Sequence, residues 1–117
     1  MLKVKEQDIV RSILDYLRYR GIPHAHVRNT GAIIQRGGKT FFARNRNPQI
    51  GVADIIGAYK GTPIAIEVKS PVGKVSPDQE SWLSTWSNKG GGAYCIARSV
   101  EHVEQFLQSL GGGTNGN

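Results

Sequence analysis

The stretch Gly51–Lys69, GVADIIGAYKGTPIAIEVK, sets two acidic residues and a lysine among apolar residues. If Ile64–Lys69 forms a strand, successive side chains point to opposite faces of the sheet. One face then carries Ile64, Ile66 and Val68, and the other carries Ala65, Glu67 and Lys69. The alternation therefore predicts that an acid and a lysine are neighbours on one side of the sheet.

The segment before this strand, Asp54–Tyr59, is apolar after its first residue. The connection Lys60–Pro63 is short enough to turn that segment back alongside Ile64–Lys69 as a hairpin. Such a hairpin would bring Asp54, Glu67 and Lys69 together. The alternative is a structural ion pair between Glu67 and Lys69 on a half-exposed strand, because an acid two residues before a lysine is common.

Basic residues are segregated along the chain. Formal net charge is +6, yet no Asp or Glu occurs between Tyr16 and Ala53. That stretch holds seven basic residues: Arg18, Arg20, Arg28, Arg36, Lys39, Arg44 and Arg46. Segregated charge favours a polyanion, most often nucleic acid, as partner. The alternative is a solvated face that keeps the protein soluble.

Length and composition indicate one soluble domain, since 117 residues with 38% hydrophobic residues can bury one core. We expect residues 1–110 to form it and 111–117, GGGTNGN, to be a disordered tail. We find no apolar run that could span a membrane and no leader pattern. The expectation is a cytoplasmic protein of a bacterium or a virus-infected host cell. The single cysteine, Cys95, lies in an apolar run and is expected to be a buried, inert thiol.

Periodicity and turn residues predict the remaining elements. Lys5–Arg20 has an amphipathic helical pattern, His24–Asn29 an extended one, and Gly31–Gln35 with Thr40–Arg44 a hairpin across a glycine pair. Asn45–Gln49 is predicted to be a loop. A helix follows Ser76 and another follows Ser99, and Ala93–Arg98 between them is expected to be a strand buried on both faces. We interpret His24 and His26 as polar surface or phosphate contacts, since two histidines alone are a weak metal signal.

Two residues on the predicted helices could join the acidic cluster. Glu6 lies on the apolar side of the first helix, where an acid in the first turn also suits the helix dipole. Gln79 lies three residues after Ser76, in the position of a capping box, and four before Leu83. The capping role of Gln79 does not exclude contact with the cluster.

Two carboxylates, a lysine and a basic surface have the chemistry of metal-dependent phosphodiester cleavage. Carboxylate oxygens suit Mg²⁺ or Mn²⁺, which lower the pKa of a bound water. A lysine beside that water can orient it and offset negative charge in the transition state.

The order and spacing of these motifs resemble a known family. Asp54, followed after twelve residues by Glu67-Val68-Lys69, is similar to the D…(D/E)xK motif of the PD-(D/E)XK nuclease superfamily. Together with Gly51–Asp54, Ile66–Ser70 and Ser76–Gln79, it resembles the VRR-NUC branch, the virus-type replication and repair nucleases. The resemblance runs from Glu6 to the last predicted helix.

The resemblance implies specific roles for these residues. Asp54 and Glu67 would bind the divalent ion, with the backbone carbonyl of Val68 as a further ligand, and Lys69 would position the attacking water. Glu6 would match the acid of the family's first helix and act as a further metal ligand. Gln79 would match the glutamine of the helix after the ExK strand and belong, like Glu6, to the catalytic set. Ala53 replaces the superfamily's proline, which shapes the backbone and contributes no ligand.

These observations predict an α/β, restriction-endonuclease-like domain with a central mixed β-sheet flanked by helices. We expect a Mg²⁺- or Mn²⁺-dependent DNA endonuclease, structure-selective in the manner of Holliday-junction resolving enzymes and acting in DNA repair, recombination or replication. Symmetric cutting of a four-way junction needs two active sites, so a homodimer is expected. The residues expected to contact DNA are Arg28, Arg36, Lys39, Arg44 and Arg46. A restriction-type or exonucleolytic enzyme, a non-catalytic nucleic-acid module, and a structural or protein-interaction role remain as alternatives.

Overall fold

The computed structural model describes residues 4–27, 32–43 and 50–111 of the chain. Its elements are α1 (Glu6–Tyr19), β1 (His24–His26), β2 (Ala32–Arg36), β3 (Lys39–Ala43), β4 (Ile55–Tyr59), β5 (Thr62–Val68), α2 (Pro77–Asn88), β6 (Ala93–Ala97) and α3 (Val100–Gly111). Each helix and strand expected from the sequence occurs within the described residues, with ends shifted by a few residues. The predicted loop at 45–49 lies outside them.

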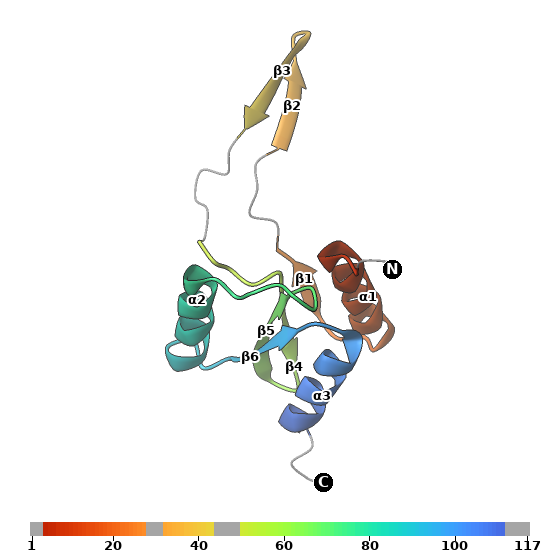
Figure 1. Cartoon of the computed structure of the whole chain (residues 1–117), viewed down its shortest axis with the longest axis vertical. Coiled ribbons are helices and arrows are strands. Elements are labelled where there is room, and N and C mark those ends of the chain that lie inside the picture. The colour runs from red at the N-terminus through yellow and green to blue at the C-terminus, as the bar shows by residue number, and fades with distance from the viewer. Residues whose placement is uncertain (1–3, 28–31, 44–49, 112–117) are drawn as a thin grey trace.

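Four strands form a mixed sheet in the order β1-β4-β5-β6 (Figure 1). The pairs β1–β4 and β4–β5 are antiparallel, whereas β5–β6 is parallel and is connected through α2. Helices cover both faces of this sheet. The α/β architecture predicted from the sequence, a central mixed sheet flanked by helices, is confirmed.

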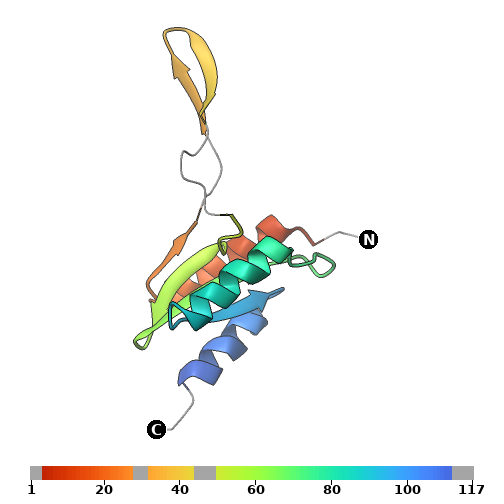
Figure 2. The same cartoon turned by 90° about the vertical axis from the view of Figure 1, so that its left-hand side faces the viewer.

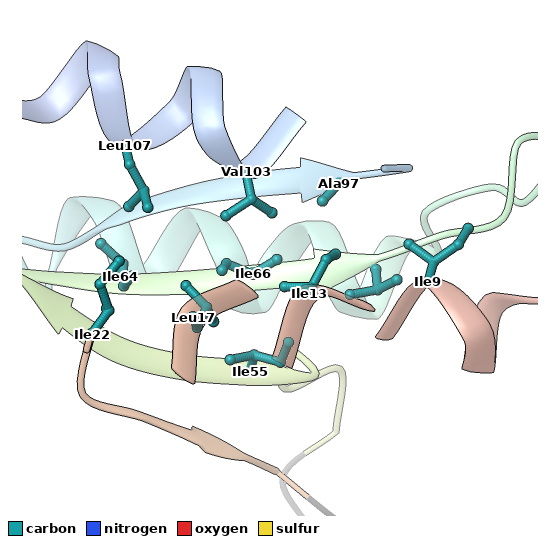
Figure 3. Close-up of a cluster of buried hydrophobic side chains, with 11 residues drawn as sticks. Ile9, Ile13, Leu17, Ile22, Ile55, Ile64, Ile66, Ala97, Val103 and Leu107 are labelled. Carbon is teal, nitrogen blue, oxygen red and sulfur yellow. The ribbon is translucent and has the colours of Figure 1, made fainter. Parts of the chain in front are cut away.

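The main core lies between one face of the sheet and helices α1 and α3 (Figure 3). Its fully buried side chains include Ile13 and Leu17 of α1, Ile66 of β5, and Val103 and Leu107 of α3. These residues recur at three- or four-residue spacing in the helices, as an apolar helix face requires. Burying each such side chain contributes about 1.5–3 kcal/mol, so this face anchors the sheet.

Helix α2 covers the other face, where Figure 2 shows it in front of the sheet with α1 behind. Leu83 packs there with Ala53 and Ala65 in a second, smaller core. Trp82 and Trp86 stack on each other with ring centroids 5.1 Å apart, and both are half-buried. The Trp86 indole N–H donates to the carbonyl of Ala93, which ties α2 to the start of β6.

The hairpin of β4 and β5 has a two-residue turn, Lys60–Gly61, with φ values of 49° and 84°. Positive φ at both positions is typical of the type I′ turn, which follows the twist of the paired strands. The turn is shorter than the Lys60–Pro63 connection expected, because Thr62 and Pro63 already pair with Tyr59 and Ala58. The predicted hairpin itself is confirmed.

β6 is an edge strand, which corrects the prediction that both of its faces are buried. Ala97 is buried against the α3 side, but Tyr94 and Ile96 on the other face are 41% and 36% exposed. A continuous apolar run does not reveal whether a strand is central or at an edge. Cys95 is half-buried rather than fully buried as expected, and its partial burial raises the pKa of the thiol to about 11, in line with an unreactive thiol.

Strands β2 and β3 form a separate two-stranded sheet around the turn Gly37–Gly38. Both glycines have positive φ, as a tight hairpin turn of this kind requires. In Figures 1 and 2 this hairpin lies beyond one end of the four-stranded sheet. It therefore forms no part of the central sheet that carries the acidic cluster.

The last helix begins after Ser99, whose hydroxyl accepts from the backbone N–H of His102, as expected for a cap. α3 extends through Gly111, the first residue of the expected tail, and residues 112–117 lie outside the described part of the chain. No helix within the described ranges is long and apolar enough to cross a membrane.

Candidate active site

Asp54 is held at the start of β4 by two neighbouring strands. Its backbone carbonyl accepts from the N–H of Val27, just past β1, at 2.7 Å. Its side-chain Oδ2 accepts from the backbone N–H of Val68 at 2.8 Å. The Asp54 carboxylate thus adds one hydrogen bond to the backbone pairing of β4 with β5. This bond holds the carboxylate beside the end of β5, where Glu67 lies.

Glu67 is buried on β5, with its residue only 2% exposed. Its Oε2 accepts from Nε2 of Gln79 at 3.0 Å and lies 3.5 Å from Nζ of Lys69. Its Oε1 is buried as well and has no hydrogen-bond partner among the described residues. A buried carboxylate oxygen without a partner is costly and uncommon in native proteins.

Burial raises the pKa of the Glu67 carboxyl to about 7, from an ordinary value near 4.5. The negative charge of Asp54 adds to this rise, whereas Lys69 opposes it. A buried carboxyl beside a second carboxylate is stabilised in its charged form by added positive charge. Lys69 supplies part of this positive charge, but the pKa of Glu67 remains above its ordinary value.

Lys69 points its ammonium toward Glu67 from the same face of β5, and its side chain is 12% exposed. The alternation of β5 predicted this arrangement, because Ile64, Ile66 and Val68 lie in the main core on the other face. A mostly buried ammonium beside a carboxylate is also what a structural ion pair would show. A simple ion pair leaves one feature unexplained, namely that Oε1 of Glu67 has no partner among the residues that the structure describes.

Gln79 makes both contacts that the sequence allowed. Its Oε1 accepts from the backbone N–H of Ser76 while the Ser76 hydroxyl accepts from the Gln79 N–H, which completes a capping box. Because Oε1 faces that N–H, Nε2 is left to donate to Glu67. One amide therefore links the start of α2 to the buried acid on β5.

Glu6 lies apart from the cluster of Asp54, Glu67, Lys69 and Gln79. It lines a cavity of about 490 Å³ together with Asp54, but its own side chain is exposed rather than on the buried side of α1 as expected. Amphipathic spacing places Glu6 on the correct side of the helix. It does not determine whether that side chain is covered, and in the structure Glu6 is exposed at the cavity.

The oxygen atoms around Glu67 fit a divalent cation in their chemistry. Carboxylate oxygens of Asp54 and Glu67, with Oε1 of Glu67 lacking a partner, suit a hard ion such as Mg²⁺ or Mn²⁺. Within residues 4–27, 32–43 and 50–111, no three His, Cys, Asp or Glu side chains gather as a metal site. The structure thus brings together two acids and leaves Glu6 apart.

Arg98, just after β6, makes contacts that the sequence did not suggest. Its Nη1 donates to the carbonyls of Ser70 and Gly73 at 2.6 and 2.8 Å. The loop so held follows Lys69 directly, and the backbone N–H of Lys69 donates to the carbonyl of Ala97. A basic residue after a strand is too common to predict this clamp.

Gly51 is a second residue whose role only the structure reveals. Its φ is +79°, and a Cβ there would overlap the carbonyl of Asp78 in the first turn of α2. The segment leading to Asp54 and the helix carrying Gln79 therefore touch backbone to backbone. A glycine three residues before the motif aspartate was a visible signal, but its partner was not.

The residues expected to contact DNA are only partly described. Lys39 is exposed at the tip of the β2–β3 hairpin, and Arg36 is its cross-strand partner in that hairpin. Arg28, Arg44 and Arg46 lie outside the described residues. His24 lies half-buried with Nδ1 2.7 Å from the carbonyl of Ile22, whereas His26 is exposed on the cavity that Asp54 lines.

Comparison with known families decides what kind of protein this site belongs to. The family model of the VRR-NUC domain matches residues 5–101, which include α1, the whole four-stranded sheet and α2. The chain belongs to the VRR-NUC family. Membership implies a nuclease-type function with DNA as substrate, and nucleases of this family generally use divalent metals. A search of curated proteins found no match to this chain.

Proposed function

We propose that this VRR-NUC protein is a Mg²⁺- or Mn²⁺-dependent endonuclease that hydrolyses phosphodiester bonds in DNA. The observation that carries the proposal is the buried Glu67, whose Oε1 has no partner in the described part of the chain and whose pKa is raised beside Asp54. A purely structural ion pair gives no reason to bury an oxygen without a partner.

Asp54 and Glu67 would hold the divalent cation, with the backbone carbonyl of Val68 as a further ligand. When bound, such a cation lowers the pKa of a water molecule and offsets negative charge at the scissile phosphate. Glu6 is exposed on the same cavity as Asp54, and we assign it to the waters around the cation rather than to direct coordination. Mg²⁺ usually keeps several waters, which makes such a contact reasonable.

Lys69 would orient the attacking water and offset charge that develops on the phosphate. Its Nζ lies 3.5 Å from Oε2 of Glu67, so the ion pair holds the ammonium at the acidic cluster. Gln79 would fix the Glu67 carboxylate through its bond to the same oxygen and leave Oε1 free for the cation. Gln79 acts here through Glu67, as a positioning residue.

We propose branched DNA, such as a flap or a four-way junction, as the preferred substrate in DNA repair, recombination or replication. The exposed Lys39 at the tip of the β2–β3 hairpin supports contact with a phosphate backbone, with Arg28, Arg36, Arg44 and Arg46 as further contacts. Symmetric cutting of a four-way junction needs two copies of this single site, so the active form on that substrate is a homodimer.

The test is cleavage of labelled linear, flapped and four-way-junction DNAs with Mg²⁺, with Mn²⁺ or with EDTA, using the wild type and Asp54→Asn. The substitution keeps the hydrogen bond from Val68 through an amide oxygen but removes the charge, so a loss of at least about 100-fold is expected, or roughly 3 kcal/mol. Arg18→Gln, an exposed change on α1, is the control.

Cleavage that persists in EDTA or in Asp54→Asn would contradict the metal mechanism. Binding without cleavage under every condition would favour the non-catalytic module, and equal cutting of linear duplex would favour a restriction-type enzyme. Sedimentation with and without junction DNA tests the homodimer, which a strictly monomeric complex would contradict.

A further inference from the structure

The cavity beside Asp54 extends well beyond the acidic cluster. Its volume is about 490 Å³, and α1, β1 and the start of β4 line it within the described residues. Pockets that take small ligands measure about 300–1,000 Å³, so this one has room for a ligand of nucleotide size. Neither the metal ligands nor Lys69 needs a cavity of that extent.

One wall of the cavity is apolar. Val10 and Leu14 lie one turn apart on α1 and are only half-buried, although both also pack on the main core. Their remaining surface lines the cavity. An apolar surface of this kind suits a sugar or the face of a base, because neither needs a hydrogen bond there.

The rest of the lining is polar and includes a cationic side chain. Arg11 is exposed on α1, between the two apolar residues, and makes no ion pair with an acid in the described ranges. Gln7 on α1 and His26 on β1, both exposed, also line the cavity. Guanidinium groups bind phosphate through charge-assisted hydrogen bonds. The lining thus combines a phosphate-binding group with a wall for a sugar or base.

We propose that this cavity takes one unpaired nucleotide of the substrate, the nucleotide next to the phosphodiester that is cut. The proposal rests on the nuclease function above, because Asp54 joins the cavity to the metal site. Val10 and Leu14 contact the sugar and base, and Arg11 contacts the neighbouring phosphate. A cavity of about 490 Å³ is of the size of one nucleotide, whereas a base-paired nucleotide would bring its partner strand with it.

This arrangement has a consequence for substrate choice. A nucleotide inside continuous duplex must unstack and unpair before it can enter the cavity, whereas one at a branch point is already unpaired or easily freed. DNA with unpaired nucleotides at the cut site is therefore cut faster than continuous duplex of the same sequence. The cavity gives a physical reason for structure selectivity that needs no recognition of sequence.

Two exposed positions allow a test that does not threaten folding. Arg11→Glu reverses the charge that faces the phosphate, and Gln7→Trp places a large side chain at the cavity. Arg18→Glu is the matched control, since Arg18 lies seven residues later on the same helix, is exposed and does not line the cavity. The probe is thymidine 5′-monophosphate, added in EDTA so that no metal contributes.

Binding is followed by amide NMR shifts, and cleavage by the kinetics of a flapped DNA with Mg²⁺. Thymidine 5′-monophosphate should shift amides of α1 and β1 around the cavity in wild type and Arg18→Glu. In Arg11→Glu and Gln7→Trp we expect these shifts to weaken and the KM for the flapped DNA to rise about 10-fold or more, with kcat nearly unchanged.

Shifts that spare the cavity, or equal binding and KM in Arg11→Glu and Arg18→Glu, would overturn the proposal. Equal rates on continuous duplex and on the same duplex with unpaired nucleotides at the cut site would overturn it too. Failure of the nuclease function itself appears differently, as wild-type protein that does not cleave any DNA with metal, while the EDTA binding experiment still reports on the cavity.

Discussion

At the scale of single residues, the site depends on how Glu67 is surrounded. Its two oxygens have unequal environments, since Oε2 receives Gln79 and Lys69 while Oε1 has no partner in the described part of the chain. Burial and Asp54 together hold the pKa of this carboxyl at about 7. Near neutral pH, the protein without metal therefore keeps a proton on Glu67 for part of the time.

This raised pKa predicts how stability depends on pH. The unfolded chain releases the Glu67 proton near pH 4.5 and the folded chain near 7, so folding binds a proton in that window. Stability without metal should therefore fall as pH rises from about 5 to 8. Melting curves in EDTA should show this fall for wild type and a weaker one for Glu67→Gln.

The same substitution separates stability from activity. Glu67→Gln removes a buried charge, so its melting temperature at pH 8 should equal or exceed that of the wild type, while cleavage falls by at least about 100-fold. Mg²⁺ should raise the wild-type melting temperature more at pH 8 than at pH 6, because the cation competes with the proton. A wild-type melting temperature that rises with pH in EDTA would contradict this account.

At the scale of elements, the site is assembled from secondary-structure ends. Asp54 precedes β4, and Glu67 lies at the end of β5 with Lys69 just after it. Gln79 lies in the first turn of α2, and Arg98 follows β6. Ends of elements have backbone groups free to bond with other segments. The contacts of Gln79 and Arg98 show how a helix start and a strand end fix the groups around Glu67.

The double role of Gln79 predicts a difference between two cap variants. Ser76→Ala and Gln79→Ala should each cost about 1 kcal/mol of unfolding free energy, because each breaks the capping box. Only Gln79→Ala also releases Glu67, so only it should lower kcat, by about 10-fold. Chemical denaturation and single-turnover cleavage measure the two effects. An equal loss of activity in Ser76→Ala would assign the effect to the cap alone.

The Arg98 clamp predicts a second positioning effect. Arg98→Gln loses the charged bonds to Ser70 and Gly73, so the loop after Lys69 should shift and kcat should fall about 10- to 100-fold. The KM for DNA should change little, since Arg98 is half-buried and faces the loop. Arg98→Lys should restore part of the activity, and Arg18→Gln should have no effect. An unchanged kcat in a folded Arg98→Gln protein would argue against this role.

At the scale of the whole molecule, the domain separates an acidic centre from a basic extension. The carboxylates lie where the central sheet meets α2, whereas the β2–β3 hairpin, with Lys39 at its tip, lies beyond the end of that sheet. This arrangement lets binding and metal chemistry be varied independently.

Neutralising the hairpin tip tests that separation. In Arg36→Gln with Lys39→Gln, DNA affinity should fall, and the slope of log affinity against log salt should become shallower by about two. Mg²⁺ affinity, followed by the shift in melting temperature, should stay unchanged. Arg18→Gln, another exposed cation of the acid-free stretch, serves as the control. A parallel loss of metal binding would mean that the hairpin and the metal site are coupled.

The sequence by itself determined the elements and the faces of β5, because strand alternation and helix periodicity act over a few neighbouring residues. It also determined the capping box at Ser76 and the pairing of β4 with β5, which brings Asp54 to Val68. These features place Asp54, Glu67 and Lys69 together before any long-range contact is known.

Only the tertiary structure decided what surrounds that cluster. The burial of Glu67, its raised pKa and the lack of a partner for its Oε1 within the described ranges depend on segments far apart in the sequence. So do the bonds from Arg98 and the exposure of Glu6. So does the exposure of Tyr94 and Ile96, since a strand becomes an edge only through the order of the sheet. Local pattern specifies which face a side chain takes, but burial and hydrogen bonding depend on what packs against that face.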